Sequence, residues 1–147
     1  MVVIVDANIL LSAISNFKKT LFNLITEVSP SIDFVVPEFV FNEIKNNEQK
    51  VSISTKSSVE KMRQNLSLLL QHILIIKDDD VVESYFKKAY EITYSIDSND
   101  TIYVAFAISL DALLWTGDLK LYRGLRRKGF TNIVTTAQLK EIIKGIK

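Results

Sequence analysis

Three aspartates that are far apart in the sequence occupy similar positions in the chain. Asp6 directly follows a short apolar run, Asp118 follows another after two intervening residues, and Asp100 begins a longer one. The short runs are typical of buried parallel strands and the longer run of a buried helix. In a parallel sheet, this order places all three carboxyl groups at the carboxyl edge of the strands, where α/β folds bind ligands. The runs comprise residues 2–5, 112–115 and 101–110.

Crowded carboxylates have the chemistry of a site for a hard divalent cation. They repel one another and resist burial, and Mg²⁺ or Mn²⁺ with oxygen ligands relieves that repulsion. Such a site can activate water against a phosphodiester and stabilise the leaving oxygen. One histidine and no cysteine leave few parts for zinc hydrolysis or imidazole catalysis. Asp111, about 15 Å away at the far end of the helix expected at 101–110, cannot join the cluster.

The same aspartates also stand where helix caps are expected. A carboxylate at a helix N-terminus accepts hydrogen bonds from free N–H groups and meets the positive end of the helix dipole. Asp97 and Asp100 could be a capping pair, and for Asp97 we favour the cap over a fifth acid of the site. Spacing and periodicity alone leave a metal site and a set of caps about equally supported.

Composition predicts one soluble domain spanning residues 1–147. The chain is 48% hydrophobic, which excludes a disordered protein, and its net charge of +1 indicates no polyanion partner on overall balance. Without cysteine there are no disulfides. The N-terminus lacks the features of a signal peptide, and the apolar stretch 66–76 is too short to span a membrane. We therefore expect a cytoplasmic protein without a membrane partner.

Apolar runs and amphipathic segments alternate along the chain. This alternation predicts a single-domain α/β/α sandwich with a mostly parallel sheet. Residues 46–55 are polar and predict a loop, while Ser57 with Glu60 and Asp80 with Glu83 predict helix caps. The expected strands are 2–5, 32–36, 73–76, 112–115 and 133–134, and the expected helices include 20–28, 38–45, 59–73, 101–110, 119–128 and 137–146.

Four short motifs resemble those of the PIN domain family. They occur in the family's order and span nearly the whole chain, so the combination is specific although each motif alone is short. The motifs read Val5-Asp6-Ala7-Asn8-Ile9-Leu10, then Pro-Glu-Phe-Val-Phe-Asn-Glu at 37–43, then Asp-Thr-Ile-Tyr-Val-Ala-Phe-Ala at 100–107, and Trp-Thr-Gly-Asp at 115–118.

The resemblance implies a metal-dependent ribonuclease with a five-stranded parallel sheet flanked by helices. Its acidic pocket would bind Mg²⁺ or Mn²⁺, and Glu43 would orient the water that attacks RNA. Glu43 depends most on the resemblance, because topology alone places Glu38 nearest the strand end. Asn8 and Thr116 would fix the carboxylates by hydrogen bonds, although turn and cap roles explain them equally well. The pocket would consist of Asp6, Glu43, Asp100 and Asp118.

A basic segment follows Asp118 directly. Lys120, Arg123 and Arg127 share one helix face and could hold RNA phosphates through sequence-independent contacts. For Arg126 and Lys128, a solvated face explains the charges equally well.

The short chain also looks like the toxin of a VapC-type toxin–antitoxin pair, with a small antitoxin as partner and a homodimer as its assembly. A housekeeping RNA-processing nuclease would carry the same motifs. An aspartyl-phosphate phosphatase would want a second aspartate where Asn8 stands, and a non-catalytic RNA-binding module would not need four acids.

Overall fold

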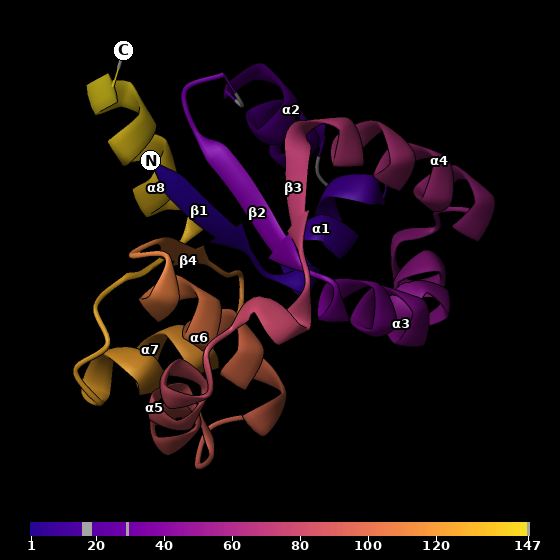
Figure 1. Ribbon diagram of the computed structural model, residues 1–147. Coiled ribbons are helices and arrows are strands. Elements are labelled where there is room, and N and C mark those ends of the chain that lie inside the picture. Colours follow the sequence, from indigo (N-terminus) through magenta and orange to yellow (C-terminus); the bar gives the residue numbers. More distant parts are fainter. Residues whose placement is uncertain (16–18, 29, 147) are drawn as a thin grey trace.

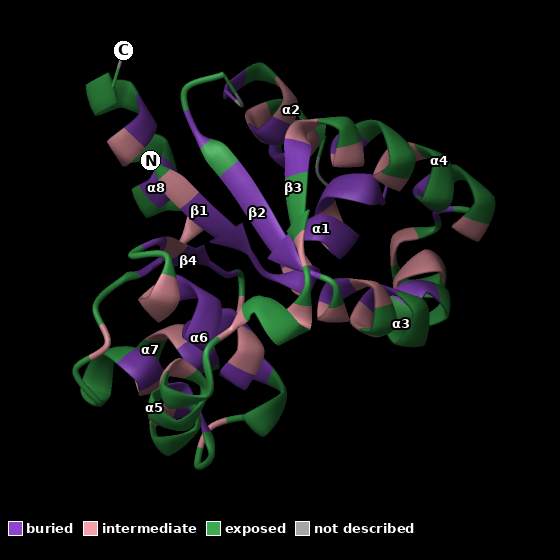
Figure 2. Cartoon of the chain, in the orientation of Figure 1, coloured by how far each residue is buried: buried purple, intermediate pink, exposed green. Residues whose placement is uncertain are grey.

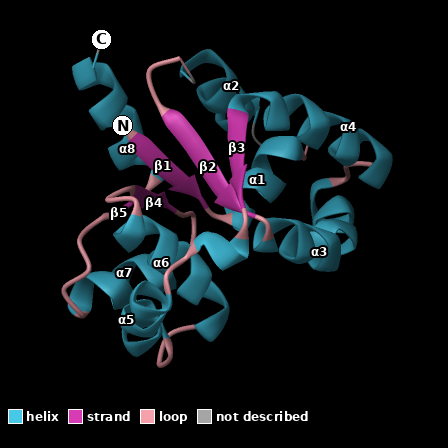
Figure 3. Ribbon diagram, viewed as in Figure 1, coloured by secondary structure: helices cyan, strands magenta, loops and turns pink. Residues whose placement is uncertain are grey.

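The computed structural model describes residues 1–15, 19–28 and 30–146. Residues 16–18, 29 and 147 of the predicted domain lie outside the described residues. Five strands form one sheet in the order β3-β2-β1-β4-β5, and every neighbouring pair is parallel (Figures 1 and 3). The predicted parallel five-stranded sheet flanked by helices is confirmed. The strands are β1 Val2–Val5, β2 Asp33–Pro37, β3 Ile73–Ile76, β4 Leu113–Trp115 and β5 Ile133–Val134.

Helices cover both faces of this sheet. In Figure 1, α1 to α4 lie on one side of the sheet and α5 to α7 on the other. No helix in the described ranges is both long and apolar enough to cross a membrane. The helices are α1 Ala7–Ile14, α2 Lys19–Val28, α3 Phe39–Thr55, α4 Val59–Leu69, α5 Glu83–Thr93, α6 Thr101–Ser109, α7 Leu119–Arg127 and α8 Thr136–Ile146, with 3-10 turns η1 Leu70–His72, η2 Asp78–Asp80 and η3 Ser98–Asp100.

Burial follows the position of each strand in the sheet. The central strand β1 is covered on both faces, and Val3, Ile4 and Val5 are fully buried (Figure 2). The edge strand β3 instead exposes Leu74 and Ile75. Helix α6 is buried nearly all round and contacts β1, β2 and β4, as its continuous apolar sequence predicts. The sheet and α6 therefore form a rigid base for the residues at the carboxyl ends of the strands.

The prediction of a loop at 46–55 is wrong, because α3 continues to Thr55. The buried positions of this helix repeat every four residues, but the third of them is Glu48 rather than an apolar residue. Arg63 of α4 donates to both carboxylate oxygens of Glu48, at 2.5 and 3.2 Å. The ion-paired Glu48 thus stands at a buried position of α3 where an amphipathic helix would normally have a hydrophobic residue.

Two predicted caps are also wrong. Ser58, not Ser57, caps α4, and its hydroxyl accepts a hydrogen bond from the Lys61 N–H at 3.0 Å. Asp80 belongs to the turn η2, and α5 begins after Val82 without a side-chain cap. Cap prediction from sequence depends on boundaries that shift by a residue or two, so these errors leave the fold unchanged.

Candidate active site at the carboxyl edge of the sheet

The strand order reverses between β1 and β4. The chain builds β2 and β3 on one side of β1, then returns to place β4 and β5 on the other side. The connections leaving β1 and β4 therefore diverge and open a crevice at the carboxyl ends of these strands. Asp6 follows β1 and its N–H donates to the Trp115 carbonyl at 3.0 Å, while Asp118 follows β4.

Asp6 is the most enclosed acid of the crevice, with 4% of its surface exposed. Thr116 Oγ1 donates to its Oδ2 at 2.7 Å, and Asn8 Nδ2 donates to the same oxygen at 3.3 Å. Burial raises the pKa of Asp6 to about 6, the Thr116 hydrogen bond opposes that rise, and repulsion from Asp118 adds to it. The carboxylate makes no side-chain hydrogen bond that caps α1.

Asn8 and Thr116 also join the loop after β4 to Asp6. The Asp118 N–H donates to Thr116 Oγ1 at 3.0 Å, and the Gly117 N–H donates to Asn8 Oδ1 at 3.1 Å. Asn8 thus donates to the Asp6 carboxylate with its amide nitrogen and accepts from the backbone with its amide oxygen, whereas the Thr116 hydroxyl makes both contacts with one oxygen. These contacts hold the two strand ends in a fixed relation.

Asp100 and Glu43 complete the acidic group from two helices. Asp100 is buried at the start of α6, where burial and then repulsion from Asp6, Asp97, Glu43 and Asp118 raise its pKa to about 8. Burial raises the pKa of the half-buried Glu43 to about 7, with further repulsion from Asp6 and Asp97. The Glu43 charge thus raises the pKa of Asp100, whereas Glu38 is exposed.

Tyr103 is a site residue that the sequence analysis missed. Its side chain is fully buried and its hydroxyl donates to Glu43 Oε1, which lowers the pKa of Glu43 against the effect of burial. Burial and the nearby Glu43 charge raise the pKa of the phenol itself. Tyr103 lies three residues after Asp100 and hence on the same face of α6. The available signal was a hydroxyl-bearing aromatic residue in an otherwise apolar helix.

The cap interpretation holds for two of the acids. Asp118 Oδ1 accepts from the N–H groups of Lys120 and Leu121, at 2.9 and 3.1 Å, and so caps α7. Asp97 Oδ1 accepts from the Asn99 N–H at 3.0 Å and caps η3. Asp100, like Asp6, makes no side-chain capping bond in the described structure. Both caps nevertheless add negative charge that acts on Asp100.

A sequence model of the PIN domain matches residues 4–140. The chain belongs to the PIN domain family. Comparison with curated protein sequences yields no match. Among solved structures, this PIN domain is similar to a chain in the crystal structure of VapBC2 from Rickettsia felis bound to a DNA fragment from their promoter. The TM-score is 0.66 at 19% identity, over 92% of this chain and 97% of that one. It is also similar to a chain of VapBC-1 from nontypeable Haemophilus influenzae, with a TM-score of 0.59 at 18% identity, over 86% and 94% of the two chains.

The donor atoms of this PIN domain are those that a hard cation prefers. All four side chains, Asp6, Glu43, Asp100 and Asp118, supply carboxylate oxygens, the ligands of Mg²⁺ and Mn²⁺. Within the described ranges, no three His, Cys, Asp or Glu side chains are already arranged to hold a metal ion. The donor atoms and charge of the acids thus suit such an ion, but their arrangement does not yet. Binding the ion would require the side chains to turn towards one another.

Helix α7 carries exposed basic side chains next to the acidic group. Lys120, Arg123 and Arg127 are exposed, and none of the three forms an ion pair in the part of the chain that the structure describes. Arg126 instead lies 5.5 Å from the Tyr122 ring centroid, and Lys128 lies 5.0 Å from that of Tyr94. Arg126 and Lys128, for which the sequence left RNA binding and a solvated face equally open, therefore contact aromatic rings of this chain.

A glycine holds α7 close to the segment that precedes the acids of η3. A Cβ atom on Gly124 would lie 2.7 Å from Ile96 Cδ1, so only glycine permits this approach without a shift of the isoleucine. Ile96 directly precedes the cap Asp97. The basic helix is therefore packed against the same segment that leads into Asp100.

Proposed function

We propose that this PIN domain is a metal-dependent ribonuclease that hydrolyses RNA phosphodiester bonds. PIN domains are generally nucleases, and one observation supports the proposal most strongly. Burial raises the pKa of three carboxyl groups, those of Asp6 after β1, Glu43 in α3 and Asp100 before α6; Asp6 further raises that of Glu43, and both raise that of Asp100. Such an array weakens a fold unless protons or a cation neutralise it, so a functional reason for it is expected.

In this proposal Asp6, Glu43, Asp100 and Asp118 would hold Mg²⁺ or Mn²⁺. The bound cation would supply electrostatic stabilisation of the charge that develops on the phosphate oxygens. Glu43 would hold or orient the attacking water, a role that needs its carboxylate ionised, and burial raises the pKa of this carboxyl to about 7 in the metal-free protein. The Tyr103 hydroxyl fixes the orientation of Glu43, while Asn8 and Thr116 fix that of Asp6.

The test is cleavage of single-stranded RNA by the purified protein with Mg²⁺, with Mn²⁺ and with excess chelator. Single-stranded DNA and a small phosphomonoester serve as parallel substrates. Cleavage of RNA that requires added cation is the expected result. Release of phosphate from the monoester without RNA cleavage would instead indicate a phosphatase, and RNA binding without cleavage under any cation would indicate a non-catalytic module.

We further propose that the chain acts as the toxin of a VapC-type pair, with a small antitoxin as partner and a homodimer as its assembly. The similarity to chains from VapBC structures supports this role. The alternative is a housekeeping RNA-processing nuclease, which would have the same motifs but would not need an antitoxin. A small open reading frame next to the gene, whose co-expression relieves growth arrest caused by this chain, is the expected finding. Light scattering of the purified protein measures the assembly.

Replacement of Tyr103 by Phe should shift the pH dependence of cleavage to higher pH. The substitution removes the hydroxyl that stabilises ionised Glu43, so the pKa of Glu43 should rise above about 7. Cleavage needs that carboxylate ionised. The pH at which the cleavage rate rises should therefore increase by about one pH unit. Rates measured from pH 5 to 9 check this, together with NMR titration of the Glu43 carboxyl carbon. A lower rate with an unmoved midpoint would show that Tyr103 is only a packing residue.

Replacement of both Lys120 and Arg123 by Ala should weaken RNA binding and reduce its dependence on salt. Each phosphate contact to single-stranded RNA contributes about 0.7 to the slope of log K against log salt, so loss of two should lower the slope by about 1.4. Both side chains are exposed, so the fold should persist. Arg126→Ala is the matched control, because Arg126 is engaged with Tyr122. An unchanged slope in the double variant would remove α7 from the RNA site.

A further inference from the structure

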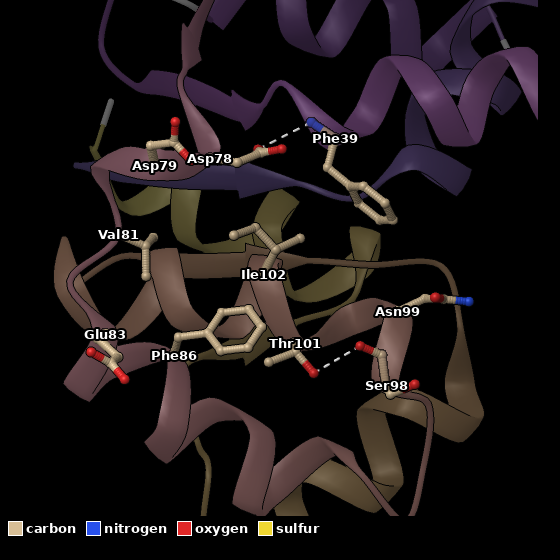
Figure 4. A pocket seen from close by; sticks show the side chains of 10 residues that line it. All are labelled: Phe39, Asp78, Asp79, Val81, Glu83, Phe86, Ser98, Asn99, Thr101 and Ile102. Atoms are coloured by element: carbon tan, nitrogen blue, oxygen red, sulfur yellow. Dashed lines mark hydrogen bonds between the residues drawn. The ribbon is translucent and has the colours of Figure 1, made fainter.

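A pocket of about 590 Å³ lies beside the acidic group, outside the residues assigned to it so far. It opens between the start of α3, the turn η2, helix α5 and the start of α6 (Figure 4). Its walls are largely apolar, with the rings of Phe39 and Phe86 at two sides and Ile102 between them. This volume is within the range of small-molecule binding sites, which are typically about 300–1,000 Å³.

Two elements, α3 and η3, contribute residues both to the pocket and to the acidic group. Asn99, which lines the pocket, directly precedes Asp100. Phe39 lines the pocket one helical turn before Glu43, and its ring makes a T-shaped contact with that of Tyr103, with 6.4 Å between centroids. Tyr103 in turn donates its hydroxyl to Glu43. A phosphodiester held at the acids would therefore place an adjoining nucleotide at the mouth of this pocket.

The polar groups of the pocket divide into engaged and free ones. Asp78 Oδ1 accepts from the Phe39 N–H at 3.1 Å, and the Thr101 hydroxyl donates to the Ser98 carbonyl at 2.8 Å. The exposed Asp79 carboxylate makes no hydrogen bond or ion pair within the described ranges. An apolar slot with a free carboxylate at its rim offers ring faces for stacking and an acceptor for an amino group.

We propose that this pocket is a nucleobase subsite that takes one unpaired base of the RNA next to the cleaved phosphate. This inference rests on the proposed ribonuclease function. The base stacks on the exposed face of Phe86, while Asp79 accepts from ring N–H and amino groups. Guanine presents two such donors side by side, whereas the edge of uracil alternates one donor with two carbonyl acceptors. The subsite therefore favours guanine over uracil at one position beside the cut.

A nucleobase explains more of the pocket than a protein side chain does. An apolar side chain of a partner would cover the rings but leave the Asp79 carboxylate without a donor. The pocket also borders the acidic group, because its lining residue Asn99 directly precedes Asp100. Unpaired bases of RNA commonly stack on aromatic side chains. Phe86 is 41% exposed although it is apolar, so a large part of its ring is available to a ligand.

The test combines a variant of the pocket with removal of a base. Cleavage products of random-sequence RNA, read by sequencing, identify the position beside the cut with the strongest base preference. Binding is then measured for a short labelled RNA of that sequence and for the same RNA with an abasic residue at that position. Loss of the base should weaken binding to the unmodified protein about tenfold, as expected for one stacked base. The same loss should have little effect on Phe86→Ala, which already lacks the stacking face.

Two controls isolate the pocket. Tyr90 is an exposed aromatic residue one turn further along α5, outside the pocket, so Tyr90→Ala should keep both the base preference and the abasic effect. Phe86→Trp, which restores a stacking face, should also keep them. Unaltered thermal melts show that the variants remain folded.

The possible failures are distinct. Cleavage by the unmodified protein with an equal abasic effect in Phe86→Ala would overturn the subsite and leave the ribonuclease in place. Protection of Phe86 by a second protein chain, with RNA affinity unchanged in the variant, would overturn the subsite in favour of a protein ligand. Absence of cation-dependent cleavage by the unmodified protein would overturn the proposed function, and the subsite with it.

Discussion

Replacement of Asp100 by Asn should abolish RNA cleavage and make the metal-free protein more stable. Asp100 is 7% exposed, and burial with repulsion from four acids raises its pKa from 3.8 to about 8. Asparagine keeps the size of the side chain and removes the charge, so at pH 8 the repulsion disappears. Each pKa unit corresponds to about 1.4 kcal/mol, and since several groups share the effect we expect a gain of about 1–3 kcal/mol. Cleavage should fall at least about 100-fold, because a proposed cation ligand is lost.

Asp111→Asn is the matched control for this result. Asp111 lies beyond the opposite end of α6, is exposed and has a φ of 50°, a left-handed conformation that asparagine tolerates well. Its replacement should leave both cleavage and stability near those of the unmodified protein. Asp118→Asn is a less selective test, because the Asp118 carboxylate also caps α7. If Asp100→Asn destabilises the metal-free protein and still cleaves RNA, Asp100 is a structural residue.

The metal-free protein should lose stability as the pH rises from about 4 to about 8, and Mn²⁺ should restore it. Asp6, Glu43 and Asp100 have folded pKa values of about 6, 7 and 8, above their usual values of 3.8, 4.5 and 3.8. Between these limits the folded protein binds more protons than the unfolded chain, so the free energy of unfolding falls with increasing pH. Below about pH 4 both states are protonated and the full contribution to stability is present.

Mn²⁺ binds the ionised carboxylates of the folded state, so the stabilisation that it gives should be largest near pH 8 and small near pH 5. Thermal melts across this range, with chelator and with Mn²⁺, measure both effects. One kcal/mol corresponds to about 4 °C in a domain of this size. Asp100→Asn should flatten the fall in the metal-free protein and weaken the response to Mn²⁺, whereas Asp111→Asn should change neither. A midpoint that rises from pH 5 to pH 8 in chelator would contradict the pKa shifts.

The sequence alone determined the sheet and the position of three of the four acids. Continuous apolar runs predict buried parallel strands, and parallel strands end at one edge, so Asp6, Asp100 and Asp118 had to lie near one another. Continuous apolar content favours burial of a whole segment, as in β1 and α6, although the apolar edge strand β3 exposes Leu74 and Ile75. The same reasoning failed at Glu48, because an ion pair with Arg63 from another helix fills a core position. No local pattern predicts a partner fifteen residues away.

The tertiary structure decided which acid plays which part. Four aspartates with the same local signal separate into two that cap helices, Asp97 and Asp118, and two whose carboxylates make no such bond, Asp6 and Asp100. Capping depends on whether the side chain points its carboxylate at the free N–H groups of the helix. The pKa depends on burial and on charges from distant elements. Likewise Tyr103 reads as a core residue until the fold brings Glu43, sixty residues earlier, against its hydroxyl. Contacts of this kind depend on how α3 and α6 pack at the end of the sheet, and spacing along the chain carries no information about that.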